Sequence, residues 1–260
     1  MAVTLLPLLK ASHFGPTVTV TAVAVALSAT DRPLPDTVLV AAAVLAGQLS
    51  IGWSNDWIDA ARDVASGRAD KPVASGLLSR RLVATAAIVA AVACLPLSLL
   101  ATPTGGAHVV AVAAGWAYNL VLKRTVWSVA PYAVAFALLV VFAMDGPPWP
   151  LVVAGGLLGA AAHFGNALPD LAEDAATGVH GLPHRLGATG SRFAALGCLA
   201  AASVPLFLLL GTPWVFAALA AVAVAAGWAW WGGSRRPVFL LVQSTALIDV
   251  AMLLLVANLR

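Results

Sequence analysis

Long apolar segments, separated by short polar or Gly/Pro-containing stretches, make up almost the whole chain. Nine such segments can be distinguished, and each has the composition of a helix that crosses a lipid bilayer. The pattern therefore predicts an all-α, polytopic membrane protein with nine transmembrane helices. The approximate bounds of these helices are 16–30, 36–54, 82–101, 107–122, 128–144, 149–167, 192–210, 213–231 and 238–258.

Composition supports a membrane location. Of the 260 residues, 61% are hydrophobic and only 10% are charged, against about 25% charged in a typical soluble domain. No low-complexity linker or soluble domain interrupts the series, so residues 1–260 are expected to form a single integral membrane domain. The alanine-rich composition favours a bacterial cell membrane as its location.

The basic residues predict the orientation of the helices. With a cytoplasmic N-terminus, 12 of the 14 Lys and Arg residues fall on the cytoplasmic side, and only Arg32 and Arg260 fall outside. Cytoplasmic loops are enriched in Lys and Arg, so the basic pI needs no nucleic-acid partner to explain it. The cytoplasmic set is Lys10, Arg62, Arg68, Lys71, Arg80, Arg81, Lys123, Arg124, Arg185, Arg192, Arg235 and Arg236.

Two cytoplasmic loops, at about 55–81 and 166–191, carry the same motif. Four predicted spans separate the copies, so both lie on one side of the membrane, unlike the halves of an inverted-repeat transporter. We interpret the duplication as an internal repeat whose copies converge on one site. In each copy Asn, Asp, Asp and Gly recur at intervals of four, as Asn55, Asp59, Asp63 and Gly67 and as Asn166, Asp170, Asp174 and Gly178.

The acidic residues are concentrated in these loops, which hold Asp56, Asp59, Asp63, Asp70, Asp170, Glu173 and Asp174 of the 11 in the chain. Carboxylates four residues apart share a helix face and repel one another unless a cation lies among them. Mg²⁺ fits this requirement, because it binds hard oxygen ligands and is often completed by substrate phosphates. We therefore predict a diphosphate substrate and a metal site whose catalytic ligands are Asp56, Asp59, Asp63, Asp170 and Asp174.

Other polar residues near the cytoplasmic side are candidates for substrate contact. Lys71 and Lys123 are expected to bind the diphosphate. His163 and Asn166, three residues apart near the end of the sixth span, are expected either to orient an acceptor or phosphate oxygen or to hydrogen-bond a neighbouring helix. Asp249 lies near the middle of the last span, where an acid tends to face a cavity or a partner.

These motifs resemble those of the UbiA superfamily of intramembrane prenyltransferases, whose loops read N-D-x-x-D-x-x-x-D and D-x-x-x-D. The residues from Asn55 to Asp63 match the first motif, and the similarity continues through Arg68 to Gly76, Tyr118 to Arg124, and Asp170 to Gly187. It covers nearly the whole chain. The chain departs from the family pattern at Ala167, Ala175 and His180-Gly181. Basic residues common in the family are absent from this second loop, and His180 or His184 is a candidate to replace them.

The resemblance implies a helical bundle around a central cavity, with Mg²⁺ held by both loops. It further implies that a prenyl diphosphate is ionised and that a lipophilic, aromatic acceptor captures the prenyl group. The alternative is a UbiA-type terpene cyclase that uses no acceptor, and same-side repeats disfavour a transporter or channel. The residues expected to bind substrate are Asn55, Arg68, Lys71, Tyr118, Lys123, Arg124, His163 and Asn166.

Overall fold

The computed structural model describes residues 2–210, 250–251, 253–255 and 258, and all regular elements within them are helices. The predicted span 213–231 and nearly all of 238–258 lie outside the described residues, as do Asp249, Arg235 and Arg236. The chain divides into two compact units, one formed by residues 1–123 and 142–145 and the other by residues 124–141 and 146–260.

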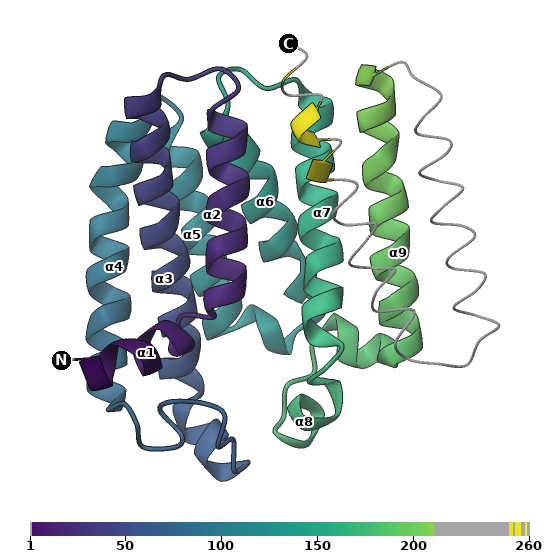
Figure 1. Ribbon diagram of the computed structural model, residues 1–260. Coiled ribbons are helices and arrows are strands. Elements are labelled where there is room, and N and C mark those ends of the chain that lie inside the picture. Colours follow the sequence, from purple (N-terminus) through teal and green to yellow (C-terminus); the bar gives the residue numbers. More distant parts are fainter. Residues whose placement is uncertain (1, 211–249, 252, 256–257, 259–260) are drawn as a thin grey trace. The chain divides into compact units, whose positions relative to one another are not determined.

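The first unit is built around one long helix, α3. This helix packs against α2, α4 and α5, and α1 lies across the lower ends of α2 and α3 in Figure 1. A single turn, Leu122–Arg124 (η1), follows α5. The helices are α1 (Ala2–Ala11), α2 (Phe14–Ser28), α3 (Leu34–Ala65), α4 (Arg80–Ala101) and α5 (Gly105–Leu120).

The second unit is held together by close helix contacts. In α7, a Cβ atom added to Gly159 would lie 2.4 Å from the carbonyl oxygen of Tyr132, and one added to Gly155 would lie 2.7 Å from Val140. These glycines let α6 approach α7 as small residues do in membrane helix pairs, and α7 also packs against α9. The elements are η2 (Val126–Val129), α6 (Ala130–Ala143), α7 (Trp149–Ala167), α8 (Leu171–Ala176) and α9 (Leu182–Leu210, broken at Gly187).

Each of the seven predicted spans in residues 2–210 coincides with a helix, with one difference in length. Helix α3 continues to Ala65, so the segment from Asn55 to Asp63, predicted to open a loop, is helical. No Gly or Pro interrupts residues 53–66, and the first residue with a positive φ after this helix is Gly67, at 70°. The loop therefore begins at Ser66 rather than at residue 55.

Several helices have the length and composition needed to cross a membrane. Among the described residues these are Leu34–Ala65, Arg80–Ala101, Val126–Ala143 and Trp149–Ala167, and the pair Leu5–Ala11 and Phe14–Ser28, bent by 72°, adds a fifth if it counts as one span. The nine-span count, the central cavity and the cytoplasmic N-terminus stay predictions.

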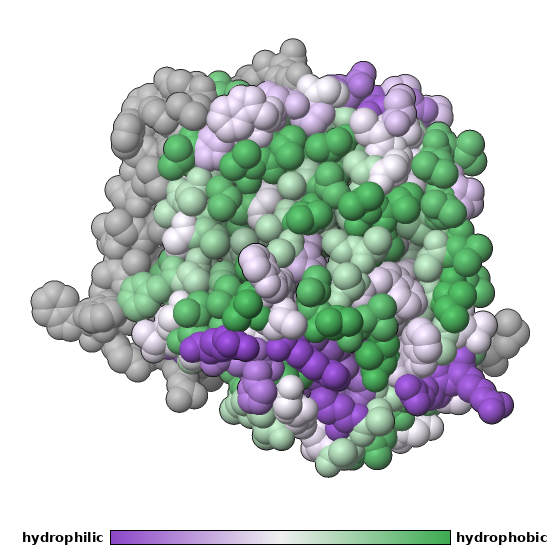
Figure 2. All heavy atoms as spheres, turned by 180° about the vertical axis from the view of Figure 1, so that it is seen from behind, coloured by the Kyte–Doolittle hydropathy of each residue, from purple (hydrophilic) through white to green (hydrophobic). Residues whose placement is uncertain are grey.

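The surface of these helices suits lipid. Hydrophobic residues cover most of the face in Figure 2, and hydrophilic residues gather along its lower edge. Large apolar side chains point outward, for example Leu100 at 75% exposure and Val92 at 66%. Contiguous apolar surface of this extent is rare on soluble monomers, so the chain is an integral membrane protein.

Candidate functional site

The first aspartate motif occupies the last turns of α3, within the first unit. Asp56, Asp59 and Asp63 are only 1%, 2% and 3% exposed. Their spacing of three and four residues places them on one face of the helix. Three buried carboxylates on one face are unfavourable unless cations or hydrogen-bond donors surround them, and the structure supplies both.

Asp59 is the most heavily coordinated of the three. Its Oδ1 accepts a hydrogen bond from Lys123, whose side chain is 4% exposed, and its Oδ2 accepts one from Arg62 Nη2 at 3.0 Å. Asn55 Nδ2 lies 3.3 Å from the same Oδ2. Arg62 Nε also lies 3.7 Å from Asp63 Oδ1, so one guanidinium serves two carboxylates.

A buried asparagine on α5 fixes the start of the motif. Asn119 donates to the carbonyl oxygen of Ile51 at 2.9 Å and to Ser54 Oγ at 2.8 Å, and its own carbonyl oxygen accepts from Asn55 at 3.2 Å. Asn119 is 2% exposed. All three hydrogen bonds of Asn119 are made within the first unit, so α5 holds the motif helix α3 in a defined rotation.

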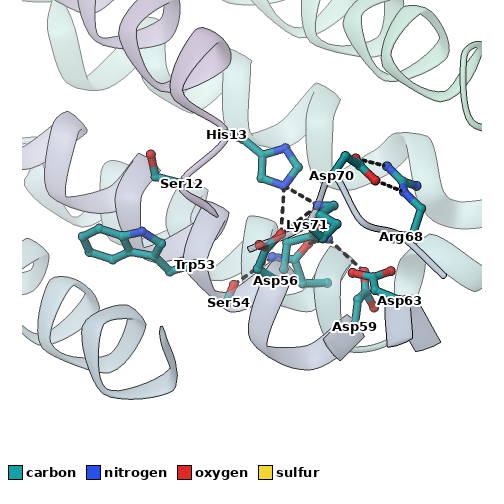
Figure 3. Close-up of polar contacts among 12 residues, drawn as sticks. Ser12, His13, Trp53, Ser54, Asp56, Asp59, Asp63, Arg68, Asp70 and Lys71 are labelled. Atoms are coloured by element: carbon teal, nitrogen blue, oxygen red, sulfur yellow. Dashed lines mark hydrogen bonds and ion pairs between the residues drawn. The ribbon is translucent and has the colours of Figure 1, made fainter. Parts of the chain in front are cut away.

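Asp56 lies close to a lysine and a histidine, as Figure 3 shows. Lys71 Nζ donates to Asp56 Oδ1 at 2.7 Å, and His13 Nε2 lies 3.7 Å from the same oxygen. The second oxygen, Oδ2, is buried and has no hydrogen-bond partner within the described residues. A buried carboxylate oxygen left unsatisfied is costly, so this atom is open to a further cation or donor.

The donor set fits a divalent cation that shares its coordination with substrate. Within the residues described, no three His, Cys, Asp or Glu side chains are arranged to hold a metal ion by themselves. Mg²⁺ is commonly bound by one or two carboxylates plus substrate phosphates. The open Oδ2 of Asp56 and the oxygens of Asp59 and Asp63 supply hard ligands of this kind.

The loop after α3 carries an exposed ion pair. Arg68 donates from Nε and Nη2 to the two carboxylate oxygens of Asp70, at 2.9 and 3.0 Å. These hydrogen bonds to the guanidinium lower the pKa of Asp70 to about 2. Arg68, predicted to bind substrate, is therefore engaged with a neighbouring acid in this structure.

The second motif, in the second unit, has a different course. Pro169 stands where the first motif has Ile58, and the helix is interrupted there, so Asp170 lies at the start of the short helix α8. Asp174 is only partly buried, with 23% of its side chain exposed, and His184 Nε2 lies 3.6 Å from its Oδ2. Of the two candidate histidines, His184 contacts the motif and His180 is exposed.

Both motifs end in the same helix cap. The amide of Arg68 donates to the carbonyl of Asp63 at 3.0 Å, and the amide of Val179 donates to the carbonyl of Asp174 at 2.9 Å. Gly67 and Gly178 take φ values of 70° and 82°. Each motif therefore ends in a Schellman cap, with its last Asp three residues from the helix end and its Gly in the left-handed region.

His163 and Asn166 belong to a polar network in the second unit. Ser128 Oγ accepts the amide of Leu182 at 3.0 Å and lies 3.0 Å from His163 Nε2. The Tyr132 side chain is hydrogen-bonded to Asn166. The interhelical alternative raised by the sequence therefore accounts for contacts of both residues.

Comparison with known proteins decides the family. A sequence model of the UbiA prenyltransferase family matches residues 17–237. The chain belongs to the UbiA prenyltransferase family. No curated protein sequence matches it.

Solved structures of UbiA homologues have a fold similar to that of this chain. A UbiA homologue from Archaeoglobus fulgidus bound to DMAPP and Mg²⁺ has a TM-score of 0.71 and 16% identity, covering 97% of this chain and 99% of that one. An apo UbiA homologue from Aeropyrum pernix K1 has a TM-score of 0.68 and 18% identity over 97% and 98%. A digeranylgeranylglyceryl phosphate synthase has a TM-score of 0.68 and 15% identity over 98% of both chains.

The structure gathers part of the predicted UbiA site in the first unit. Asn55 and Lys123 are bonded to Asp59, and Lys71 is bonded to Asp56 on the same face of α3. The remaining predicted residues in or beside this unit lie as follows: Asp63 shares the face of the three acids, Arg68 binds Asp70, Tyr118 is half-buried on α5, and Arg124 is exposed.

Three residues that contact the predicted site residues were not themselves predicted to belong to the site. Arg62 was counted only as a cytoplasmic charge. Asn119 gave a usable signal, because an amide inside an apolar segment needs hydrogen-bond partners. His13 gave none, since only the tertiary structure brings it to Asp56.

Proposed function

We propose that this UbiA-family protein is a Mg²⁺-dependent intramembrane enzyme that ionises a prenyl diphosphate and transfers the prenyl group to a lipophilic, aromatic acceptor. The observation that carries the proposal is the buried carboxylate face of α3, where Lys71 and Lys123 are bonded to Asp56 and Asp59 and one oxygen of Asp56 is open. Homologues of similar fold bound to DMAPP or GPP with Mg²⁺ support it.

The reaction requires heterolysis of the bond between the prenyl C1 and the bridging oxygen. The electron pair leaves with the diphosphate, and the allylic cation forms a bond to the acceptor, which loses a proton. When bound, Mg²⁺ neutralises charge on the leaving group as a Lewis acid. Lys71 and Lys123 donate hydrogen bonds to the diphosphate oxygens as negative charge develops there.

Asp56, Asp59 and Asp63 have two tasks in this proposal. Their carboxylates ligate the cation, and those of Asp56 and Asp59 hold the two lysines in place before substrate arrives. We extend the proposal to Asp170 and Asp174 on the strength of the sequence repeat. His184 Nε2 lies 3.6 Å from Asp174 Oδ2.

The test compares two isosteric substitutions on one helix. Purified protein is incubated with Mg²⁺ and dimethylallyl, geranyl, farnesyl or geranylgeranyl diphosphate, and released diphosphate is measured. Asp56→Asn keeps the side-chain size and should lower the rate by about 100-fold or more. Asp36→Asn, in the first turn of α3, is the matched control and should retain the wild-type rate.

Product analysis separates the two reactions. Mass spectrometry with and without phenolic acceptors should show a prenylated acceptor, whereas a terpene hydrocarbon or alcohol formed without acceptor identifies a cyclase. Wild-type turnover in Asp56→Asn would remove the site assignment. If no prenyl diphosphate of any length is consumed, prenyl diphosphate chemistry itself is refuted.

A further inference from the structure

His13 lies at the first aspartate motif although it precedes the first predicted span. Its Nε2 is 3.2 Å from Lys71 Nζ and 3.7 Å from Asp56 Oδ1. Figure 3 shows the imidazole pointing from the turn between α1 and α2 toward both groups. The histidine is 43% exposed, whereas the lysine is 15% and the aspartate 1% exposed.

The two distances define what the imidazole does. A lysine ammonium has donors and no acceptor, so a hydrogen bond across this 3.2 Å separation runs from Lys71 Nζ to His13 Nε2. The separation of 3.7 Å from Asp56 is too long for a hydrogen bond. Lys71 Nζ is thus the atom within hydrogen-bonding distance of both His13 and Asp56.

The backbone at His13 is held in an unusual conformation. Its φ and ψ are 55° and 57°, the only positive φ of a non-glycine residue in the described part of the chain. Positive φ is uncommon for non-glycine residues, although His is enriched in this region together with Asn and Asp. Such a conformation persists only where the surroundings over-determine it, and it is often found at functional sites.

The surroundings of this turn are fixed by α3. Trp53 Nε1 donates to the carbonyl oxygen of Leu8 at 2.8 Å. Ser12 packs so closely on Gly52 that a Cβ there would lie 2.2 Å from the Ser12 carbonyl oxygen. Both α3 residues lie within three positions before Asn55, where the motif begins. Helix α1 is thus anchored to α3 at the point that directs His13 onto Lys71.

We propose that His13 is a positioning residue, whose imidazole holds the Lys71 ammonium where it binds the diphosphate of the substrate. The inference rests on the proposed function and deepens it by assigning α1 a part in the site. Without the imidazole, the four-carbon stem of Lys71 regains rotamer freedom that binding must then remove. The affinity for diphosphate falls by roughly tenfold, as expected for one hydrogen bond to a charged group.

Two substitutions separate the imidazole from the backbone. His13→Gly adopts the left-handed conformation without strain and removes the acceptor, so the unfolding temperature should not fall. His13→Gln returns an acceptor oxygen at about the reach of Nε2. Binding of inorganic pyrophosphate with Mg²⁺, measured by calorimetry, should weaken about tenfold in His13→Gly and recover in His13→Gln.

A double-mutant cycle tests whether the effect passes through Lys71. In a Lys71→Ala background, His13→Gly should weaken pyrophosphate binding no further. Equal weakening in both backgrounds would show that His13 acts on the ligand itself and would overturn the positioning role. Wild-type affinity in His13→Gly, or no recovery in His13→Gln, would overturn it as well.

A ligand-free spectrum distinguishes this inference from the proposed function. The chain has only three lysines, Lys10, Lys71 and Lys123, so lysines labelled with ¹³C at Cε give an assignable NMR spectrum. His13→Gly should move the Lys71 signal and leave that of Lys10 in place; an unmoved Lys71 signal refutes the inference. If the signal moves but wild-type protein binds no pyrophosphate, the proposed function fails and the positioning role fails with it. If pyrophosphate binds equally to both proteins, the positioning role alone fails.

Discussion

The buried pair of Asp59 and Lys123 provides the sharpest stability test of the site. Their side chains are 2% and 4% exposed, and Lys123 Nζ donates directly to Asp59 Oδ1. Lys123 follows α5 and Asp59 lies on α3, so the pair links two helices of the first unit. We consider Asp59→Asn, Lys123→Met and the double variant, all close in side-chain volume to the wild type.

The two single variants should differ in cost. Asp59→Asn leaves the Lys123 ammonium buried against a neutral amide, and breaking a buried pair in this way costs about 3–5 kcal/mol. Lys123→Met leaves Asp59 with Arg62 at 3.0 Å and Asn55 at 3.3 Å. Its cost should therefore be smaller, about 1–3 kcal/mol.

The double variant should be more stable than the two single costs together predict. It removes both charges at once, and replacing a whole buried pair with neutral groups is often close to neutral. The coupling free energy is expected to be about 2 kcal/mol. The unfolding free energies are measured by SDS titration in mixed micelles. Additive costs, within about 0.5 kcal/mol, would refute the pair as a coupled unit.

Three further outcomes follow from single residues. Gly159→Leu should destabilise the second unit by about 1–3 kcal/mol in the same titration, because its Cβ would lie 2.4 Å from a carbonyl oxygen of α6; an unchanged midpoint would contradict that contact. Gly67→Ala and Gly178→Ala should each cost about 1–2 kcal/mol, and Asn at either position should cost less. Because the pKa of Asp70 is lowered to about 2 from 3.8, Asp70→Asn should lower the unfolding free energy by less than about 1 kcal/mol above pH 4. That difference should vanish as the pH falls through 2, and one that persists there would exclude the carboxylate as its source.

Hydropathy was sufficient to locate the helices because it reports a local property. Each described apolar segment must satisfy its backbone hydrogen bonds internally in lipid, so it forms a helix whatever its neighbours. The length of α3 was harder to predict. The polar residues from Asn55 onward resembled the start of a loop, yet they contain no helix breaker before Gly67 and continue the helix.

The site residues likewise divide into those that a local sequence pattern predicts and those that depend on tertiary contacts. Asp56, Asp59 and Asp63 were predictable because a helix places residues three and four apart on one face. Lys71 and Lys123 were predicted to bind the diphosphate, but their hydrogen bonds to Asp56 and Asp59 were not predicted. His13 depends on a left-handed turn and on the packing of Ser12 against Gly52, and no local pattern in the sequence encodes such a contact.

The internal repeat acquires a second explanation from the structure. The shared interval from the last Asp to Gly is the geometry of a Schellman cap, seen at Asp63 and Gly67 and again at Asp174 and Gly178. The part of each motif from the last Asp to the Gly is therefore required for ending a helix. The part before it differs between the two copies, because Pro169 interrupts the helix in the second copy. The side chains of Asp56, Asp59 and Asp63 are at most 4% exposed, whereas the side chain of Asp174 is 23% exposed. The equal spacing of the two motifs therefore does not imply that they bind metal equally well. Loss of a carboxylate should reduce turnover most in the first copy.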